Sequence, residues 1–523
     1  MEPSAAATTK KTAHRHAQVR GTGHHGELRG LGLNTRSSQF EGRFGRMFRT
    51  LPPAKFDEDV LKDLARAMTA PADPPTPEDQ IDDEENVGTL TNPGISAGYT
   101  YLGQFIDHDL TFDPASSLQR QNDPDALVDF RTPRFDLDSV YGRGPNDQPY
   151  LYRDDGRTML LGAPLAPNRT DPNPREVPRN TPEGGDPGRA LLGDPRNDEN
   201  VIVSQLQSAM LRFHNRVAAV LGSSADFEEI QRMVRWHYQW VVLHDFLPTV
   251  IGKDTTSDIL GQPAGDGTAA AQPHLKFFKP QQNAFMPVEF SVAAYRFGHS
   301  MVRPIYRLNL NIDRLPIFSA DGNDLRGFRP FAPDRAIDWS LFFRFDPNAP
   351  PVGKNRLQPA YKPDTSLVNP LGSLPASVAV NPSSLAERNL LRGFRMELPS
   401  GQAVAKAMGL APIPDKNLKV GKATEADSPA NKSIVDVSPK FAGNAPLWFY
   451  VLAEAQQEFV NNQTPIRLGK VGGTIVGEVF VGLMLADSHS YLRQNPNFRP
   501  LAELADGNGN FDMAQLLRQA MQN

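Results

Sequence analysis

Helical periodicity is the feature that most restricts the fold of this chain of 523 residues. In the segment VIVSQLQSAMLRFHNRVAAVL, residues 201–221, apolar side chains recur three or four positions apart, as they do on one face of a buried helix. Few segments alternate apolar and polar residues with the period of two that marks a half-buried strand. We therefore expect a mainly α-helical protein with long loops, little β structure and no internal repeat.

Composition divides the chain into two parts. Residues 1–40 are polar, basic and rich in Gly and His, and we expect a disordered tail there; metal binding by those histidines is the alternative, although no fixed ligand spacing supports it. Residues 41–523 contain no evident linker and are expected to form one large domain. Helices are predicted at 56–68, 98–110, 200–221, 225–250, 287–302, 376–397, 400–408, 445–461, 473–487 and 512–522.

Charge and residue usage exclude several classes of protein. A net charge of −5 argues against general attraction to nucleic acid or acidic membranes. The sequence contains no run of 18 apolar residues, so it predicts no membrane-spanning helix. The absence of cysteine excludes disulfides, thiolate metal ligands and cysteine catalysis. No secretory signal is readable, so either a cytoplasmic location or export by a non-standard route fits the sequence. We expect a monomer.

The stretch YTYLGQFIDHDLTFDP places two carboxylates beside a histidine within an apolar frame, where charges need partners. On a helix, Gln104, Asp107 and His108 stand at i, i+3 and i+4 and share one face. Asp109 points about 100° further round the helix axis. The two aspartates should therefore serve different sites.

A second acidic segment, RTPRFDLDSVYG, offers a partner for Asp109. Thr132, Asp136 and Asp138 occupy alternate positions, and the backbone carbonyl of residue 134 can fill the gap between them. Oxygen ligands in that number suit Ca²⁺. An Asp-rich turn beside a solvated carboxylate is the alternative interpretation.

Three further segments are weak signals when taken singly. Arg196 and Glu199 precede the helix at 200–221, a position that both residue types often occupy. His299 lies in a largely apolar segment, where a hydrogen-bonded core histidine is more common than a metal ligand. Asn389 and Arg392 are unexceptional helix residues.

Taken together, these motifs resemble the animal-type haem peroxidases of the peroxidase–cyclooxygenase superfamily, in a bacterial-type form, over roughly residues 40–500. GQFIDHDLTF resembles the distal histidine motif of that family, TPRFDLDSVYG its calcium loop, and RNDEN, followed later by FHNR, its distal arginine segment. YRFGHSMV resembles the proximal histidine helix, and the stretch from Asn389 to Leu398-Pro399 the proximal asparagine segment. Five ordered motifs are a far more specific signal than any one of them.

The resemblance implies a role for each residue around a haem b group. His299 would be the axial iron ligand, and Asn389 would hydrogen-bond its other ring nitrogen. His108 would move a proton between the two oxygens of hydrogen peroxide. Arg196 would stabilise the charge on the departing oxygen, and Gln104 would hold a water or a halide.

The same resemblance implies how haem and calcium are held. Asp107 and Glu199 match the carboxylates that become ester-linked to haem in family members; simple hydrogen bonding is the alternative. Arg296 and Arg392 match positions near the haem propionates, with surface salt bridges as their alternative role. The partners implied are hydrogen peroxide and a small electron donor. The calcium ligands implied are Asp109, Thr132, Arg134 through its carbonyl, Asp136 and Asp138.

Departures from the family pattern leave other functions to weigh. Asn200 stands where chloride-oxidising members with a third haem link have methionine, so bromide, iodide, thiocyanate or aromatic donors are expected instead. A fatty-acid oxygenase of this superfamily is one alternative, but those enzymes need a tyrosine three residues before the proximal histidine. Arg296 stands at that position here and Tyr295 one residue earlier. The other alternative is a calcium-stabilised binding or adhesion protein with a vestigial site.

Overall fold

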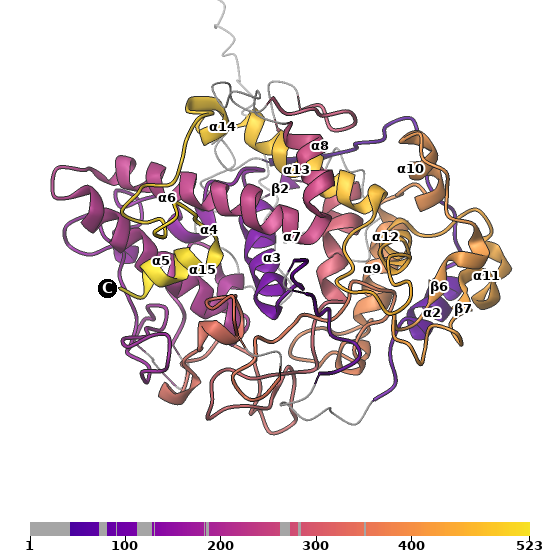
Figure 1. Cartoon of the computed structure of the whole chain (residues 1–523), viewed down its shortest axis with the longest axis horizontal. Coiled ribbons are helices and arrows are strands. Elements are labelled where there is room, and N and C mark those ends of the chain that lie inside the picture. Colours follow the sequence, from indigo (N-terminus) through magenta and orange to yellow (C-terminus); the bar gives the residue numbers. More distant parts are fainter. Residues whose placement is uncertain are drawn as a thin grey trace, which may run out of the picture.

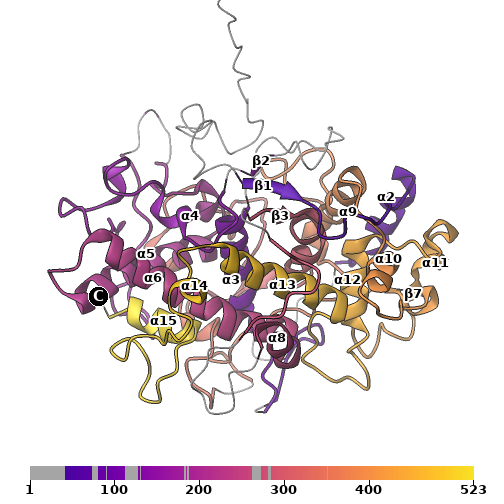
Figure 2. The ribbon, with the colours of Figure 1, turned by 90° about the horizontal axis from the view of Figure 1, so that it is seen from above.

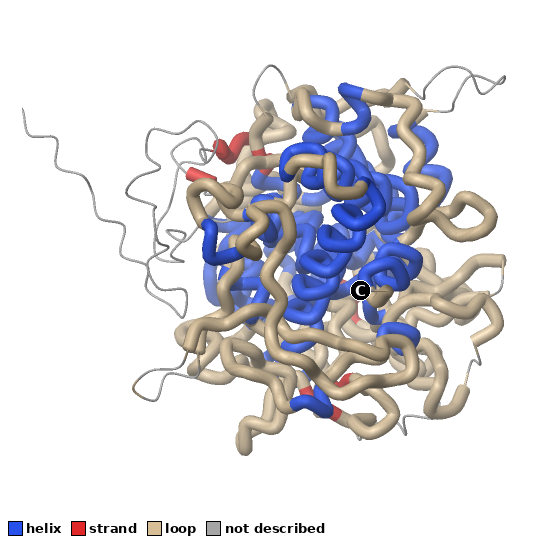
Figure 3. Tube along the Cα trace, turned by 90° about the vertical axis from the view of Figure 1, so that its left-hand side faces the viewer, coloured by secondary structure: helices blue, strands red, loops and turns tan. Residues whose placement is uncertain are grey.

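The computed structural model describes residues 42–72, 81–89, 91–111, 128–129, 131–181, 184, 188–261, 272–280, 284–349 and 352–522. The tail expected at 1–40 lies outside these residues. Among the described residues, helices fill the interior of the molecule and loops surround them (Figure 3). This arrangement confirms the mainly α-helical fold that the sequence predicts.

One group of helices is built around α5 (Val201–Leu221). The side chain of its N-cap residue, Asn200, accepts hydrogen bonds from the backbone amides two and three positions ahead, which otherwise lack partners in the first helical turn. α5 packs against α6 (Phe227–Val241) and α15 (Met513–Ala520). Figure 1 shows these helices on one side of α3 (Ala97–Leu110), which lies in the middle of the molecule.

A second group lies on the other side of α3, as Figures 1 and 2 both show. It consists of α2 (Glu58–Ala67), α9 (Leu385–Arg395), α10 (Gly401–Ala407) and α12 (Leu447–Gln456). α2 packs on α9, and α12 contacts both α9 and α10. Helix α3 therefore runs between two helical groups and is buried along most of its length.

Helix α13 (Lys470–Ala486) is the most apolar of the long helices and is buried almost throughout. The carboxylate of Glu454 on α12 caps its first turn, because it accepts hydrogen bonds from the amides of Val471 and Gly472 at 2.9 and 3.1 Å. A Cβ atom on Gly472 would stand 2.6 Å from the Val451 side chain. The close approach of α12 and α13 thus depends on glycine at this position.

The remaining regular elements are short. The described strands each have four residues or fewer: β1 (Gly42–Gly45) pairs antiparallel with β2 (Val128–Asp129) and parallel with β3 (Met286–Pro287), β4 (Ile305–Tyr306) pairs with β5 (Leu315–Pro316), and β6 (Lys419–Val420) pairs with β7 (Lys432–Ser433). The short α-helices are α4 (Asp138–Tyr141), α7 (Leu247–Ile251), α8 (Lys253–Leu260), α11 (Ile434–Val437) and α14 (Tyr491–Gln494). Within the described ranges, no helix has both the length and the apolar character to cross a bilayer.

The α-helix predicted at 287–302 is wrong in type. A π-helical turn, η5 (Glu289–Ala293), is followed by a 3₁₀ segment, η6 (Ala294–His299). The buried carboxylate of Glu289 accepts hydrogen bonds from the backbone amides of Met47 and Phe48, both at 3.0 Å. This contact with a distant segment fixes the start of η5, and tertiary contacts of this kind override local helix preference.

Two other helix predictions need correction at their boundaries. The segment 225–250 is interrupted by a π-helical turn, η4 (Val242–Phe246), between α6 and α7. The segment 376–397 becomes helical only at α9, where the Ser384 side chain accepts a hydrogen bond from the Glu387 amide as an N-cap. Pro382, two residues earlier, is incompatible with a continuing helix, because proline has no amide hydrogen.

Candidate active site

A cavity of about 250 Å³ lies between α3 and the irregular segment η5–η6. One face of α3, the side chain of Glu199, and the segment from Tyr295 to Val302 line it. Gln104, Asp107 and His108 all stand on its wall. Asp109 is fully buried on a different side of α3, as the helical spacing predicts.

The imidazole of His108 is held from behind by Asn197. His108 Nδ1 lies 2.7 Å from Asn197 Oδ1, and Asn197 Nδ2 donates to Gln207 Oε1 at 2.8 Å. Because the amide nitrogen is committed to Gln207, its oxygen faces the ring and His108 Nδ1 carries the proton. The other ring nitrogen, Nε2, lies 3.7 Å from Glu199 Oε1 on the cavity wall. Neither Asn197 nor Gln207 was predicted from the sequence as a site residue, although Asn197 directly follows Arg196 in the RNDEN motif.

Glu199 and Gln104 meet beside His108. Gln104 Nε2 donates to Glu199 Oε1, and Gln104 Oε1 accepts from Asn200 Nδ2 at 3.1 Å. Burial raises the pKa of Glu199 to about 7, although the Arg196 guanidinium opposes this shift. The Glu199 carboxyl group therefore exchanges its proton near neutral pH. Asn200, which caps α5, is held by Gln104 at the edge of the site.

Arg196 lies behind His108 rather than on the cavity wall. Its Nη2 donates to the backbone carbonyl of His108 at 3.0 Å and to Asp194 Oδ2 at 2.8 Å. Asp194 also pairs with Arg131, at 2.7 Å, and the two guanidinium groups hold the pKa of this buried carboxyl well below its ordinary value. The role of Arg196 in stabilising charge stays a prediction.

His299 occupies the opposite wall, at the end of η6. Burial, together with the nearby Arg296 guanidinium, lowers the pKa of His299 to about 3, so the imidazole is neutral at pH 7. Its Nδ1 lies 2.8 Å from Asn389 Nδ2, and Asn389 Oδ1 accepts from Arg296 Nη1 at 3.4 Å. Rotating the Asn389 amide by half a turn would let Nδ1–H donate to the oxygen, which is the arrangement that metal binding through Nε2 requires.

The two arginines predicted at the propionate edge are placed differently. Arg296 lines the cavity, and its Nε donates to the Ser291 carbonyl at 3.0 Å. Arg392 is half-buried on α9, three residues beyond Asn389, and is not among the residues that line the cavity. Asp107 is on the cavity wall, where its Oδ1 accepts from the Thr111 hydroxyl at 3.1 Å.

The predicted acidic site assembles around α3. Carboxylate oxygens of Asp109, Asp136 and Asp138 lie within 4.8 Å of one another. Burial, together with the charges of the other two, raises the pKa of Asp109 well above its ordinary value. Burial also raises the pKa of Asp138 to about 7, against the effect of Arg131. Asp109 and Asp138 are buried and Asp136 is half-buried, and carboxylates gathered in this way need a cation or protons.

The loop that presents these carboxylates is strained. Leu137, between Asp136 and Asp138, adopts φ 57° and ψ 34°, a left-handed conformation that non-glycine residues rarely occupy. The Thr132 hydroxyl donates to Asp136 Oδ2 at 2.7 Å, and the Arg134 amide donates to the Thr132 carbonyl at 2.7 Å. The strain turns both aspartates toward Asp109, and strain of this kind often marks a ligand site.

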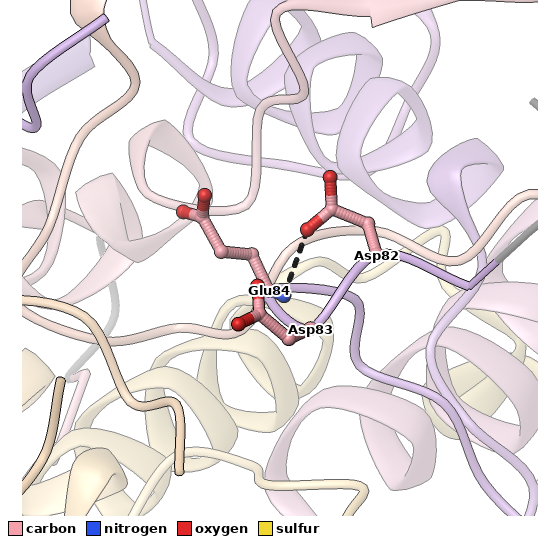
Figure 4. Close-up of side chains that lie close together, drawn as sticks. All are labelled: Asp82, Asp83 and Glu84. Carbon is pink, nitrogen blue, oxygen red and sulfur yellow. Dashed lines mark hydrogen bonds between the residues drawn. The ribbon is translucent and has the colours of Figure 1, made fainter. Parts of the chain in front are cut away.

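A second acidic cluster, Asp82, Asp83 and Glu84, is neutralised by protein groups. Figure 4 shows these three side chains and the hydrogen bond of 2.9 Å from the Glu84 amide to Asp82 Oδ1. Lys422 Nζ lies 2.9 Å from Glu84 Oε1, and the Tyr361 hydroxyl donates to Asp82 at 2.9 Å. This cluster needs no ion to explain its charges.

A wider cavity of about 590 Å³ continues from the first and shares His299, Glu199 and Gln104 with it. Its outer part is mostly apolar and includes Phe318 and Leu374. Together the two cavities provide an inner space with an apolar approach, and the volume of the wider one falls within the range of cofactor and ligand sites, about 300–1,000 Å³.

Comparisons with known proteins agree with this geometry. The family model described as animal haem peroxidase matches residues 115–319, which include Arg196, His299 and the predicted calcium loop. Thyroid peroxidase of Homo sapiens is 32% identical over 168 residues, which are 30% of this chain and 16% of the human protein. The chain thus matches less than a fifth of the length of that relative.

Two solved structures share the fold. Peroxidase A from Dictyostelium discoideum superposes with a TM-score of 0.56 at 16% identity, over 89% of this chain and 92% of that one. Fatty acid alpha-dioxygenase from Arabidopsis thaliana gives a TM-score of 0.53 at 15% identity, over 90% of this chain and 74% of that one. Residues 115–319 are thus similar to the animal haem peroxidase family, and the chain shares the fold of both solved structures.

Proposed function

We propose that this protein is a haem-dependent peroxidase that uses hydrogen peroxide to oxidise a small electron donor. The observation that carries the proposal is the placement of two imidazoles, the buried His108 and the half-buried His299, on the walls of one cavity. Each ring meets an asparagine side chain through Nδ1, at 2.7 Å for Asn197 and 2.8 Å for Asn389. The nitrogen that can act on a ligand is then Nε2 in both rings.

The residues present fit a haem group. His299 is neutral at pH 7 and would hold the haem iron through Nε2, while Asp107, Glu199 and Arg296 line the same cavity. When bound, haem supplies the redox chemistry with peroxide and with the electron donor. We infer that Asp107 and Glu199 hold the edge of the group, either through ester links or through hydrogen bonds. The predicted propionate contacts of Arg296 and Arg392 belong to the same proposal.

The chain's own part in the reaction is proton transfer beside His108. With the proton of Nδ1 committed to Asn197, Nε2 can accept a proton from one peroxide oxygen and return it to the other. Glu199, 3.7 Å from Nε2, has a pKa of about 7 and can exchange a proton with the imidazole. We propose that Gln104 orients Glu199 and a bound water or halide. Arg196 is proposed to provide positive charge behind His108 as negative charge develops on the departing oxygen.

We also propose that Ca²⁺ binds at Asp109, Asp136 and Asp138, with Thr132 and the carbonyl of Arg134 completing its ligands. The gathered carboxylates, two of them buried, support this proposal. Asp109 directly follows His108 on α3, so a cation there would stabilise the part of the helix that presents the imidazole.

The proposed donors are bromide, iodide, thiocyanate or small aromatic compounds. Asn200 donates to Gln104 Oε1 and caps α5, so its side chain is committed to the protein at the position that the resemblance associates with a third haem link. The apolar lining of the outer cavity favours aromatic donors over strongly hydrated anions.

A fatty-acid oxygenase is the second candidate, supported by the fold shared with the alpha-dioxygenase and by the apolar outer cavity. Tyr295, the tyrosine nearest the proximal position, stacks on Phe290 with ring centroids 4.7 Å apart and donates to the Gly103 carbonyl at 3.2 Å. These contacts hold Tyr295 in place as a wall residue. Peroxide-free oxidation of linoleate would favour this candidate over the peroxidase.

One experiment tests the proposed function. The protein is reconstituted with haem and calcium, and peroxide-dependent oxidation of bromide, iodide, thiocyanate and a phenol is measured side by side. We expect turnover of at least one donor, and we expect His108→Ala to slow the reaction with peroxide by about 10²-fold or more. Turnover that is unchanged in His108→Ala would refute the assigned role of His108. A folded protein that takes up no haem would instead favour the binding or adhesion alternative.

A further inference from the structure

Tyr99 is a cavity residue that the proposed peroxide chemistry does not use. It lies on α3, and its hydroxyl donates a hydrogen bond of 2.6 Å to Asp245 Oδ1. The second oxygen of Asp245 accepts from the Met513 amide at 2.8 Å, which fixes the carboxylate. A phenol with a carboxylate at this distance can lose an electron and pass its proton along the hydrogen bond, so that no net charge is created on the ring.

His244 directly precedes Asp245 in the π-helical turn η4 and lies at the protein surface. His244 is exposed, and its imidazole stacks on Trp240 with ring centroids 3.8 Å apart. His244 Nε2 lies 3.0 Å from the hydroxyl of Tyr491. Single π-helical turns within α-helices occur often at functional sites. Here the extra residue per turn lets neighbouring side chains serve the interior and the surface.

We use the name surface cluster for Trp240, His244 and Tyr491. Trp240 is half-buried, and the exposed guanidinium of Arg499 lies 5.5 Å from the centre of its ring. Tyr491 is 2% exposed, so its phenol needs a protein partner for its proton, and His244 is that partner. Every step from Tyr99 to the surface cluster is therefore a hydrogen bond, a ring stack or a covalent neighbour.

Tyr295 also lines the cavity, and its contacts argue against a role in carrying an electron out of it. Its hydroxyl donates to the backbone carbonyl of Gly103, which is a poor base and cannot take the proton from an oxidised phenol. Tyr99 has a carboxylate in the equivalent position. Of the two, only Tyr99 is equipped for coupled loss of an electron and a proton.

We propose that Tyr99 and the surface cluster are the two ends of an electron-transfer relay, through which the site oxidises bulky phenolic donors that cannot enter the cavity. The inference rests on the proposed function, because hydrogen peroxide, acting through haem, is the oxidant. It adds a second class of donor that reacts at the surface near Trp240 and Tyr491.

The transfer balances at each step. Tyr99 gives one electron to the cofactor, and its hydroxyl proton moves to Asp245 Oδ1. Tyr491 then gives one electron to Tyr99, which takes its proton back from Asp245, while the Tyr491 proton moves to His244 Nε2. A phenol outside the protein gives one electron and one proton. The electron passes through Trp240, whose ring centroid lies 6.1 Å from that of Tyr491, and restores Tyr491. The proton on His244 returns to Tyr491, and the donor's proton goes to solvent.

The test compares one donor chemistry in two sizes: a free phenol and the same phenol attached to a large dextran. In the protein reconstituted with haem and calcium, Tyr491→Phe and Trp240→Phe should lower kcat/KM for the dextran-bound phenol by about tenfold or more and leave the free phenol within about twofold. Tyr150→Phe is the matched control, because Tyr150 is 47% exposed on the surface and lies outside the cavity lining. It should affect neither donor.

A second readout locates the oxidised side chains. After addition of peroxide without a donor, a nitroso spin trap followed by peptide mapping should label Tyr491 or Trp240, and Tyr99→Phe should abolish that label. The relay would be overturned if Tyr491→Phe and Trp240→Phe oxidised both donors as fast as the parent protein does and if neither residue were labelled in the parent. So would a parent protein that oxidises the free phenol but not its dextran conjugate. If the parent oxidises neither, the proposed function fails and the relay with it.

Discussion

The ring of His108 is oriented by Asn197, whose Oδ1 lies 2.7 Å from His108 Nδ1. Asn197 cannot turn its amide over without breaking its own hydrogen bond of 2.8 Å to Gln207. The pair therefore places the imidazole proton on Nδ1 and leaves Nε2 basic. This relationship gives an amide side chain the task of fixing the tautomer of the proposed base.

Replacing Asn197 by alanine should slow the reaction of the haem-loaded protein with peroxide by about 10–100-fold, the usual cost of losing a partner that orients a site residue. The reason is that His108 can then rotate and place its proton on either nitrogen. Asn197→Asp keeps an oxygen that accepts from Nδ1 and should retain more of the rate than Asn197→Ala. Stopped-flow absorbance after mixing with peroxide measures both variants. Identical rates in Asn197→Ala and the parent would show that the ring needs no such partner.

His299 makes a different prediction, which concerns binding rather than rate. His299→Ala should bind haem weakly or with altered ligation, because the neutral imidazole on that wall is lost. The Soret absorption band of the reconstituted variant reports the change, and added imidazole should restore part of the parent spectrum. Asn389→Ala should keep haem, and its Soret band should shift less than that of His299→Ala. A His299→Ala spectrum that matches the parent would exclude His299 as the axial ligand.

The arrangement on α3 could be predicted because it depends only on helix geometry. Residues at i, i+3 and i+4 share a face in any α-helix, so Gln104, Asp107 and His108 had to line one space and Asp109 another. The meeting of Asp109 with Asp136 followed from the chemistry of acidic residues, which need a common counter-charge when buried. These predictions required no knowledge of how distant segments pack.

The features that could not be predicted from the sequence depend on contacts between segments that are far apart in the chain. The segment that carries His299 is not an α-helix, because Glu289 is tied to the amides of Met47 and Phe48 far away in the sequence. Asn197 carries no distinctive signal, since an amide becomes important only through the neighbours that the fold supplies. Arg196 lies behind the cavity because it pairs with Asp194, which also pairs with Arg131. The spacing of the motifs does not predict this pairing.

Calcium removal should disturb the distal side of the site through Asp109. Prolonged chelation is expected to alter the absorption spectrum of the haem-loaded protein and to lower its melting temperature, because three gathered carboxylates lose their counter-ion. Asp109→Asn should weaken calcium binding. Asp82→Asn in the second acidic cluster is the matched control and should not, since lysine and tyrosine side chains hold that cluster. A chelated protein that has lost the ion but keeps its spectrum and stability would break the proposed link between calcium and α3.

Glu199 should give the haem-free, calcium-saturated protein a pH dependence near neutrality. Its pKa is raised from 4.5 to about 7 by burial, so the folded state binds the proton more tightly than the unfolded state does. The stabilisation from this group is thus complete below the unfolded pKa of 4.5 and is lost as the pH rises through about 7. Glu199→Gln, which keeps a neutral side chain at every pH, should flatten the fall in the free energy of unfolding across this window. Urea unfolding at a series of pH values measures it; parallel curves for the variant and the parent would mean that Glu199 ionises in the folded protein as it does in the unfolded chain.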